Sequence, residues 1–129
     1  MKAKVLVVDD ERDVEPLFRQ NLRREIKAGK FSLDFAFSGE EAVEHLDVDV
    51  PPQVIVILSD INMPGGMSGL ELLSEIRPKR PDVSIIMVTA YGDDKTRSDA
   101  ANRGADAFFT KPVDFKALRS DLDRIISQT

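Results

Sequence analysis

The chain has 129 residues, of which 42% are hydrophobic, and its 18 Lys and Arg against 23 Asp and Glu give a net charge of −5 at pH 7. This length suits one domain, and the interspersed charges disfavour a surface for nucleic acid. The lack of cysteine excludes disulfides and thiolate chemistry, and because we find neither a membrane-spanning apolar run nor a signal peptide, we expect a cytoplasmic protein.

Strand and helix patterns alternate along the chain. In chain order we expect a strand at about 4–8, a helix from near 13 to 27, a strand at 31–37, a helix after Ser38 that carries Ala42, Val43 and Leu46, a strand at 54–58, a helix at 70–77, a strand at 84–88, a helix at 94–102, a strand at 105–110 and a helix at 115–126. Short runs rich in Val and Ile are typical of strands buried on both faces of a parallel sheet. Right-handed crossovers then predict an α/β fold: a doubly wound, five-stranded parallel sheet of order 2-1-3-4-5 in a flavodoxin-like three-layer sandwich.

Several residues mark where the helices begin and end. Gly29 is expected to stop the first helix, and Pro78 the third. Ser38 with Glu41 three residues later predicts an N-cap and capping box for the second helix. The basic segment at 77–81 is interpreted as a solvated loop.

Polar residues follow four of the expected strands at the point where each strand ends. Asp9 and Asp10 follow the first strand, Asp60 the third, Thr89 the fourth and Lys111 the fifth. The carboxyl ends of parallel strands meet at one edge of a sheet, where ligands bind. We therefore expect three carboxylates, a hydroxyl and an ammonium group to converge there.

These groups suit phosphoryl chemistry. Crowded carboxylates repel one another, and an acidic site of oxygen ligands with access to water suits Mg²⁺. The Lys111 ammonium and the Thr89 hydroxyl can contact a phosphoryl group, while an aspartate can itself be the nucleophile. The residues thus predict an edge at which Asp60 accepts a phosphoryl group.

At this point the sequence resembles a family. The residues that carry the resemblance occur in order along the whole chain: Val8-Asp9-Asp10-Glu11, Asp60-Ile61-Asn62-Met63-Pro64, Gly69-Leu70-Glu71-Leu72, Val88-Thr89-Ala90 and Lys111-Pro112. They look like the receiver domain of bacterial response regulators, of the chemotaxis-regulator kind. The resemblance implies one receiver domain over residues 1–129.

The resemblance also implies a role for each residue of the acidic edge. Asp60 would be the phosphoacceptor and a Mg²⁺ ligand. Asp10 would bind Mg²⁺ directly, Asp9 mainly through metal-bound water, and Asn62 through its backbone carbonyl. One feature departs from the family pattern, because the loop at 64–69 looks one residue longer than the usual form.

Two further roles follow from the same resemblance. Thr89 and Lys111 would contact the phosphoryl group, and the bond between Lys111 and Pro112 would be cis. Phe108 matches the aromatic residue that changes rotamer together with Thr89, and this role is favoured over the alternative that it is plain core. The pair would form the switch.

The function that follows is a signalling switch of a two-component system and not an enzyme. A sensor histidine kinase or a phosphotransfer protein would phosphorylate Asp60 in the presence of Mg²⁺, and an effector domain or protein would bind through the helix at 94–102, the strand at 105–110 and the helix at 115–126. We expect no direct contact with nucleic acid or membrane.

Two other functions stay open. The first is an interaction module with a receiver fold that works without phosphorylation. The second is a phosphatase with an aspartate nucleophile, which Asn62 disfavours because a general acid is expected at that position. His45 is read as a surface or half-buried residue, and Tyr91 as either a gate for water or an exposed loop residue.

Overall fold

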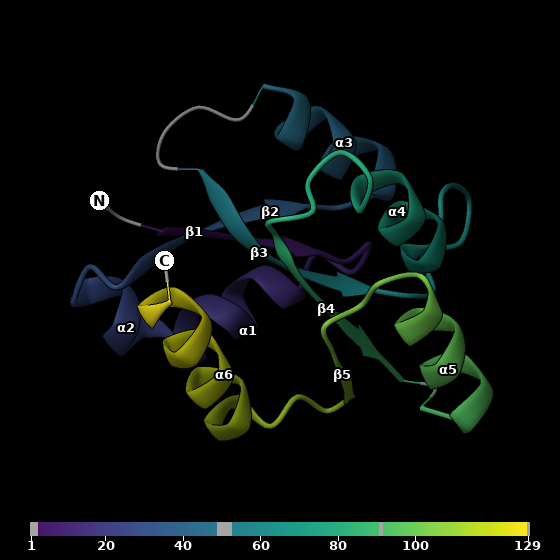
Figure 1. Cartoon of the computed structure of the whole chain (residues 1–129). Coiled ribbons are helices and arrows are strands. Elements are labelled where there is room, and N and C mark those ends of the chain that lie inside the picture. The colour runs from purple at the N-terminus through teal and green to yellow at the C-terminus, as the bar shows by residue number, and fades with distance from the viewer. Residues whose placement is uncertain (1–2, 49–52, 91, 129) are drawn as a thin grey trace.

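Five parallel strands form the centre of the molecule (Figure 1). The computed structural model describes residues 3–48, 53–90 and 92–128. The strands lie in the order β2-β1-β3-β4-β5, which confirms the predicted topology. Their bounds are β1 (Ala3–Val8), β2 (Phe31–Ala36), β3 (Val54–Asp60), β4 (Ser84–Thr89) and β5 (Ala107–Thr110).

Helices cover both faces of this sheet (Figure 1). One face packs against α1 (Val14–Asn21), α2 (Arg23–Lys27) and α6 (Phe115–Ser127), the other against α3 (Gly39–Asp47), α4 (Gly69–Ile76) and α5 (Asp94–Asn102). Within the described ranges no helix has the length and apolar character needed to cross a membrane.

Alternate residues of each strand enter two separate hydrophobic cores. In β1, Leu6 and Val8 pack into the core on the α3–α5 side, whereas Val5 and Val7 pack into the core beside α1 and α6. All four are almost completely buried. Burial on both faces explains why this strand is apolar throughout instead of alternating.

The first helix is not continuous, and here the prediction of one helix over 13–27 is wrong. The structure places a break at Leu22, whose φ and ψ are −109° and 15°. The side-chain amide of Asn21 donates to the Leu17 carbonyl at 2.9 Å, and the Asn21 carbonyl accepts from Arg119 Nη1 at 3.1 Å. These hydrogen bonds compete with regular helical bonding and account for the break.

Side-chain caps fix the starts of α3 and α4. The Ser38 hydroxyl accepts from the Glu41 amide at 3.0 Å, which confirms the predicted N-cap, but the predicted capping box with Glu41 does not form there. The complete reciprocal capping box forms one helix later, between Ser68 and Glu71. Both helices therefore begin at defined residues on the carboxyl edge of the sheet.

The basic segment at 77–81 is not simply solvated, which corrects its interpretation as a solvated loop. Arg77 donates to the carbonyl oxygens of Val83 and Gly104, both at 2.8 Å, and forms an ion pair of 2.9 Å with Asp106. Arg80 donates to the Val54 carbonyl at 3.0 Å. The two side chains tie the loops at the amino edge of the sheet together.

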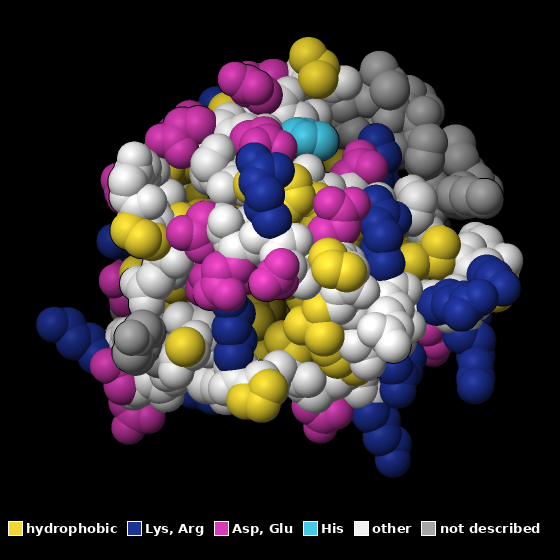
Figure 2. Space-filling view, turned by 180° about the vertical axis from the view of Figure 1, so that it is seen from behind, with side chains coloured by type: hydrophobic (Ala, Val, Ile, Leu, Met, Phe, Trp, Pro, Cys, Tyr) yellow, Lys and Arg dark blue, Asp and Glu magenta, His cyan; other side chains and the backbone are white. Residues whose placement is uncertain are grey.

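On the rest of the surface, acidic and basic side chains are interspersed. Figure 2 shows acidic and basic groups interspersed, with hydrophobic side chains between them, on the face opposite to that of Figure 1. His45 is half-buried on α3, with its Nε2 atom 4.0 Å from Glu41 Oε1, as expected. Tyr91 lies outside the described residues.

The contacts of Arg77 lead to a first prediction. Arg77→Met should lower the free energy of unfolding by about 2 kcal/mol, because half-buried carbonyl groups lose their donor. Lys79→Met, which removes only an exposed pair with Glu75, should cost less than about 0.5 kcal/mol. Urea denaturation of both variants measures this difference, and equal effects would contradict the structural role of Arg77.

Candidate functional site

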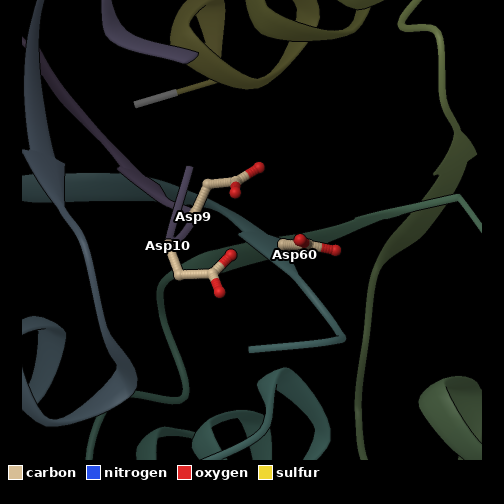
Figure 3. Close-up of side chains that lie close together, drawn as sticks. All are labelled: Asp9, Asp10 and Asp60. Atoms are coloured by element: carbon tan, nitrogen blue, oxygen red, sulfur yellow. The ribbon is translucent and has the colours of Figure 1, made fainter. Parts of the chain in front are cut away.

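Three carboxylates lie together at the carboxyl edge of the sheet (Figure 3). Asp9 and Asp10 directly follow β1, and Asp60 is the last residue of β3. One oxygen of each lies within 4.8 Å of the others. Asp9 and Asp60 are 3% and 6% exposed, whereas Asp10 is open to solvent. The edge therefore has two buried acids and one that solvent can reach.

Lys111 lies between the two buried acids. Its Nζ atom is 2.9 Å from Asp9 Oδ2 and 3.4 Å from Asp60 Oδ2. The Lys111 amide donates to the Thr89 carbonyl at 2.8 Å, which positions the segment after β5 against the end of β4. The peptide bond between Lys111 and Pro112 is cis, which confirms the prediction.

The charges of the site are not balanced. Burial and the neighbouring Asp9 raise the pKa of Asp60, and the Lys111 ammonium opposes this only partly. Burial disfavours the charged form of Lys111, but hydrogen bonds and charges from Asp9 and Asp60 outweigh it and raise the lysine pKa. One ammonium thus faces three carboxylates, and the excess negative charge is what a divalent cation would neutralise.

The donor set fits Mg²⁺. Carboxylate oxygens and water are the ligands that this ion prefers, and the exposed Asp10 leaves room for bound water. The Asn62 backbone follows Asp60 by two residues, and its residue is exposed. Asp9, Asp10, Asp60 and the Asn62 carbonyl could together hold the ion, as the sequence analysis expects.

The other two predicted residues lie on the neighbouring strands. Thr89 ends β4 and is fully buried, directly beside Thr110 of β5 in the sheet register. Phe108 lies in β5, is half-buried and packs against the core on the α3–α5 side. The Arg97 guanidinium of α5 sits 4.7 Å from the centre of the Phe108 ring. Phe108 therefore connects the sheet with α5.

Sequence reasoning missed the importance of Gly69. A Cβ atom at this position would lie 2.0 Å from the Asp60 carbonyl oxygen, so only glycine fits. The Gly69 amide also donates to the Ile61 carbonyl at 2.8 Å. The signal was present in the sequence as a glycine at the first turn of a helix, where it is otherwise unfavourable.

A cavity of about 410 Å³ opens beside the buried acids and Lys111. Its apolar lining comes from the ends of β1, β3 and β4, from α1 and from residues 112–115, and it includes Phe18 and Phe115. Leu17, also in the lining, is 48% exposed. An apolar surface thus borders the charged edge.

Comparison with known proteins agrees with this geometry. Residues 5–123 match the response regulator receiver domain family. The chain is 36% identical over 118 residues to the response regulator protein PilR of Pseudomonas aeruginosa, covering 92% of the chain and 25% of that protein. It is 35% identical over 115 residues to a cyclic di-GMP phosphodiesterase of Thermotoga maritima, covering 89% and 28% respectively. The chain therefore spans about a quarter of the length of these relatives.

A solved structure shares the whole fold. The response regulator protein TrrA of Thermotoga maritima, in complex with Mg²⁺ and BeF, is 35% identical to this chain and superimposes with a TM-score of 0.79. The match covers 97% of this chain and 99% of that one.

The raised pKa of Asp60 predicts how stability depends on pH. The unfolded chain loses this proton near pH 3.8, before the folded protein does, so the free energy of unfolding falls as pH rises from there to the raised folded value. Metal-free Asp60→Asn has no carboxylate to ionise and so keeps this part of the free energy of unfolding. At pH 7 it should melt at a higher temperature than the unaltered protein, and the difference between the two melting temperatures should shrink at low pH.

The control is Glu44→Gln, which neutralises an exposed carboxylate on α3. Thermal melts across pH in the presence of a chelator give the comparison. If Asp60→Asn melts no higher than the control variant at pH 7, the carboxylates at this edge do not repel one another as described.

Proposed function

The chain belongs to the response regulator receiver domain family, and we propose that it is a phosphorylation-dependent switch of a two-component system, with Asp60 as the phosphoacceptor. The observation that carries this proposal is the buried Asp60 carboxylate, which lies next to both the Lys111 ammonium and the Asp9 carboxylate. Residues 1–129 would form one receiver domain in the cytoplasm.

The chemistry follows from the position of Asp60. A carboxylate oxygen attacks the phosphorus atom of the donor, a bond from phosphorus to Asp60 forms, and the donor leaves with the electrons of the bond that breaks. Burial disfavours the ionised carboxylate and thereby makes it more basic, which favours attack. The product is an acyl phosphate on Asp60.

The neighbouring groups stabilise the charge that arrives. Lys111 Nζ lies 3.4 Å from Asp60 Oδ2 and can move its contact from the carboxylate to a phosphoryl oxygen. Asp9, Asp10, Asp60 and the Asn62 carbonyl would hold Mg²⁺, which would supply further positive charge to stabilise the phosphoryl group. Thr89 ends β4, the strand next to β3, and its hydroxyl would donate a hydrogen bond to the same group.

The phosphodonor would be a histidine kinase or a phosphotransfer protein. The apolar cavity beside Lys111, with Leu17 at its exposed rim, supports docking of a protein rather than entry of a small molecule alone. In this function the chain turns over no substrate of its own. It receives the phosphoryl group and responds with a conformational change that an effector would recognise.

The change of shape would pass through Thr89 and Phe108 to the surface of α5, β5 and α6. Phosphorylation adds about two negative charges, which draw the Thr89 hydroxyl toward the phosphoryl group and leave space for the Phe108 ring. The only completely buried residue of α5 is Ala100, so this helix is weakly anchored. An effector would bind to this surface.

The phosphoacceptor can be tested directly. Incubation with acetyl phosphate and Mg²⁺ should add one phosphoryl group to the protein, because Asp60 is the nucleophile, and Asp60→Asn should show no adduct. Intact-mass spectrometry measures this. Asp99→Asn, a change of a surface aspartate on α5, serves as the control and should still be modified. An adduct that persists in Asp60→Asn would refute the assignment.

The switching surface can be tested by hydrogen exchange with beryllofluoride, a phosphoryl mimic. We expect protection to change in α5 and β5 and less in α6, because α6 buries both Leu118 and Leu122. Asp60→Asn should show no change under the same conditions. Changes confined to α1, α2 and α3 would mean that the signal does not pass through Thr89 and Phe108.

A further inference from the structure

The loop between β3 and α4, residues 61–68, carries Asn62 and is the segment that looks longer than usual in the sequence. Its last residues are well fixed: Ser68 caps α4, and the next amide, that of Gly69, donates to the Ile61 carbonyl at 2.8 Å. The middle of the loop has two successive glycines, Gly65 and Gly66, which give it little side-chain packing of its own.

The middle of the loop also lies over a hollow. A cavity of about 240 Å³ lies beside it, and Asp10, Phe37 and Glu40 line this cavity together with loop residues. Packing beneath the loop is therefore incomplete on the side that faces the acidic edge. Ile61 and Met63 are buried in the core and Met67 packs partly against it, whereas positions 64–66 are exposed, so this middle part needs another contact to hold it in position.

Glu40, in the first turn of α3, makes the contact that does so. Its Oε2 atom accepts a hydrogen bond from the Met67 amide at 3.0 Å. Among the described residues no other hydrogen bond joins positions 62–67 to α3. Hydrogen bonding thus attaches the loop to α3 through a single carboxylate, next to the close approach of the Met67 side chain to Gly39.

Two glycines allow this close contact. A Cβ atom at Gly66 would lie only 3.0 Å from Glu40 Oε2, and a Cβ atom at Gly39 only 2.9 Å from the Met67 Cβ atom. Larger residues at either position would push the loop away from α3. The local sequence therefore fits a loop that rests against the first turn of this helix.

We propose that Glu40 is a positioning residue for the metal site: its carboxylate fastens loop 61–68 to α3 and so keeps the backbone at Asn62 in place beside Asp10 and Asp60. The inference rests on the proposed function, because it takes the Asn62 carbonyl to be a Mg²⁺ ligand. Glu40 does not touch the ion. It acts through the Met67 amide and the short stretch of loop between Met67 and Asn62.

Three variants separate the hydrogen bond from the charge. Glu40→Ala removes both, Glu40→Gln keeps an oxygen acceptor without the charge, and Glu44→Ala removes a negative charge from the same helix at an exposed position. For each variant, NMR measures exchange of the Met67 amide in metal-free protein, calorimetry measures Mg²⁺ affinity, and urea denaturation measures stability.

We expect Glu40→Ala to expose the Met67 amide to rapid exchange and to weaken Mg²⁺ binding by about tenfold, the lower range for loss of a group that orients metal ligands. Glu40→Gln should restore most of both properties, and Glu44→Ala should change neither. A loss of Mg²⁺ affinity without a matching loss of global stability marks a positioning role.

Three outcomes would overturn the inference. The first is a Mg²⁺ affinity in Glu40→Ala that equals that of the unaltered protein. The second is a Glu40→Gln variant as impaired as Glu40→Ala, because charge and not the hydrogen bond would then matter. The third is unchanged exchange of the Met67 amide in Glu40→Ala. If instead the unaltered protein binds no Mg²⁺, the proposed function fails, while Met67 exchange still tests the loop contact by itself.

Discussion

The crowding of three carboxylates around one lysine is the constraint on which the rest of the molecule depends. Burial raises the pKa of Asp60, and Asp9 adds to the effect, so the metal-free site opposes folding. The two hydrophobic cores, one on each face of the sheet, have to offset that cost. An excess of negative charge at a rigid edge is also what a divalent cation would neutralise, and in the proposed function this edge would receive the phosphoryl group.

The parallel sheet is what makes this crowding possible. Lys111 and Asp9 are 102 positions apart in the sequence, yet their side chains are 2.9 Å apart, because both follow strands that end at the same edge. β1 and β3 are neighbours in the sheet, and this pairing of strands is enough to bring Asp9 and Asp60 together, so the loops are not needed to position them. The loops are then free to differ in length while the acids stay in place.

Periodicity and strand-end residues were sufficient to predict the strand order and the convergence of Asp9, Asp10, Asp60 and Lys111. They could not predict the break in the first helix or the attachment of the loop at 61–68. Both features depend on contacts between residues far apart in the sequence, and such contacts leave no periodic pattern. Arg119 interrupts the first helix by binding a carbonyl 98 positions earlier, and Glu40 holds an amide 27 positions later. Residue propensity and spacing indicate which residues share a strand or helix and which face they occupy. They do not indicate which side chain of another element will supply a hydrogen bond.

The two sides of the site differ in how firmly they are held, and this difference suits a switch. Asp9 directly follows β1 and Asp60 ends β3, two neighbouring inner strands of the sheet, and both residues are almost completely buried. On the other side, β5 lies at the edge of the sheet, none of its residues is fully buried, and α5 buries only Ala100. In the proposed function, a charge added at Asp60 would therefore be relieved most easily by movement of the weakly packed side. Arg97 joins the two elements of that weak side by stacking on Phe108, so that rotation of this ring would also release or draw in α5.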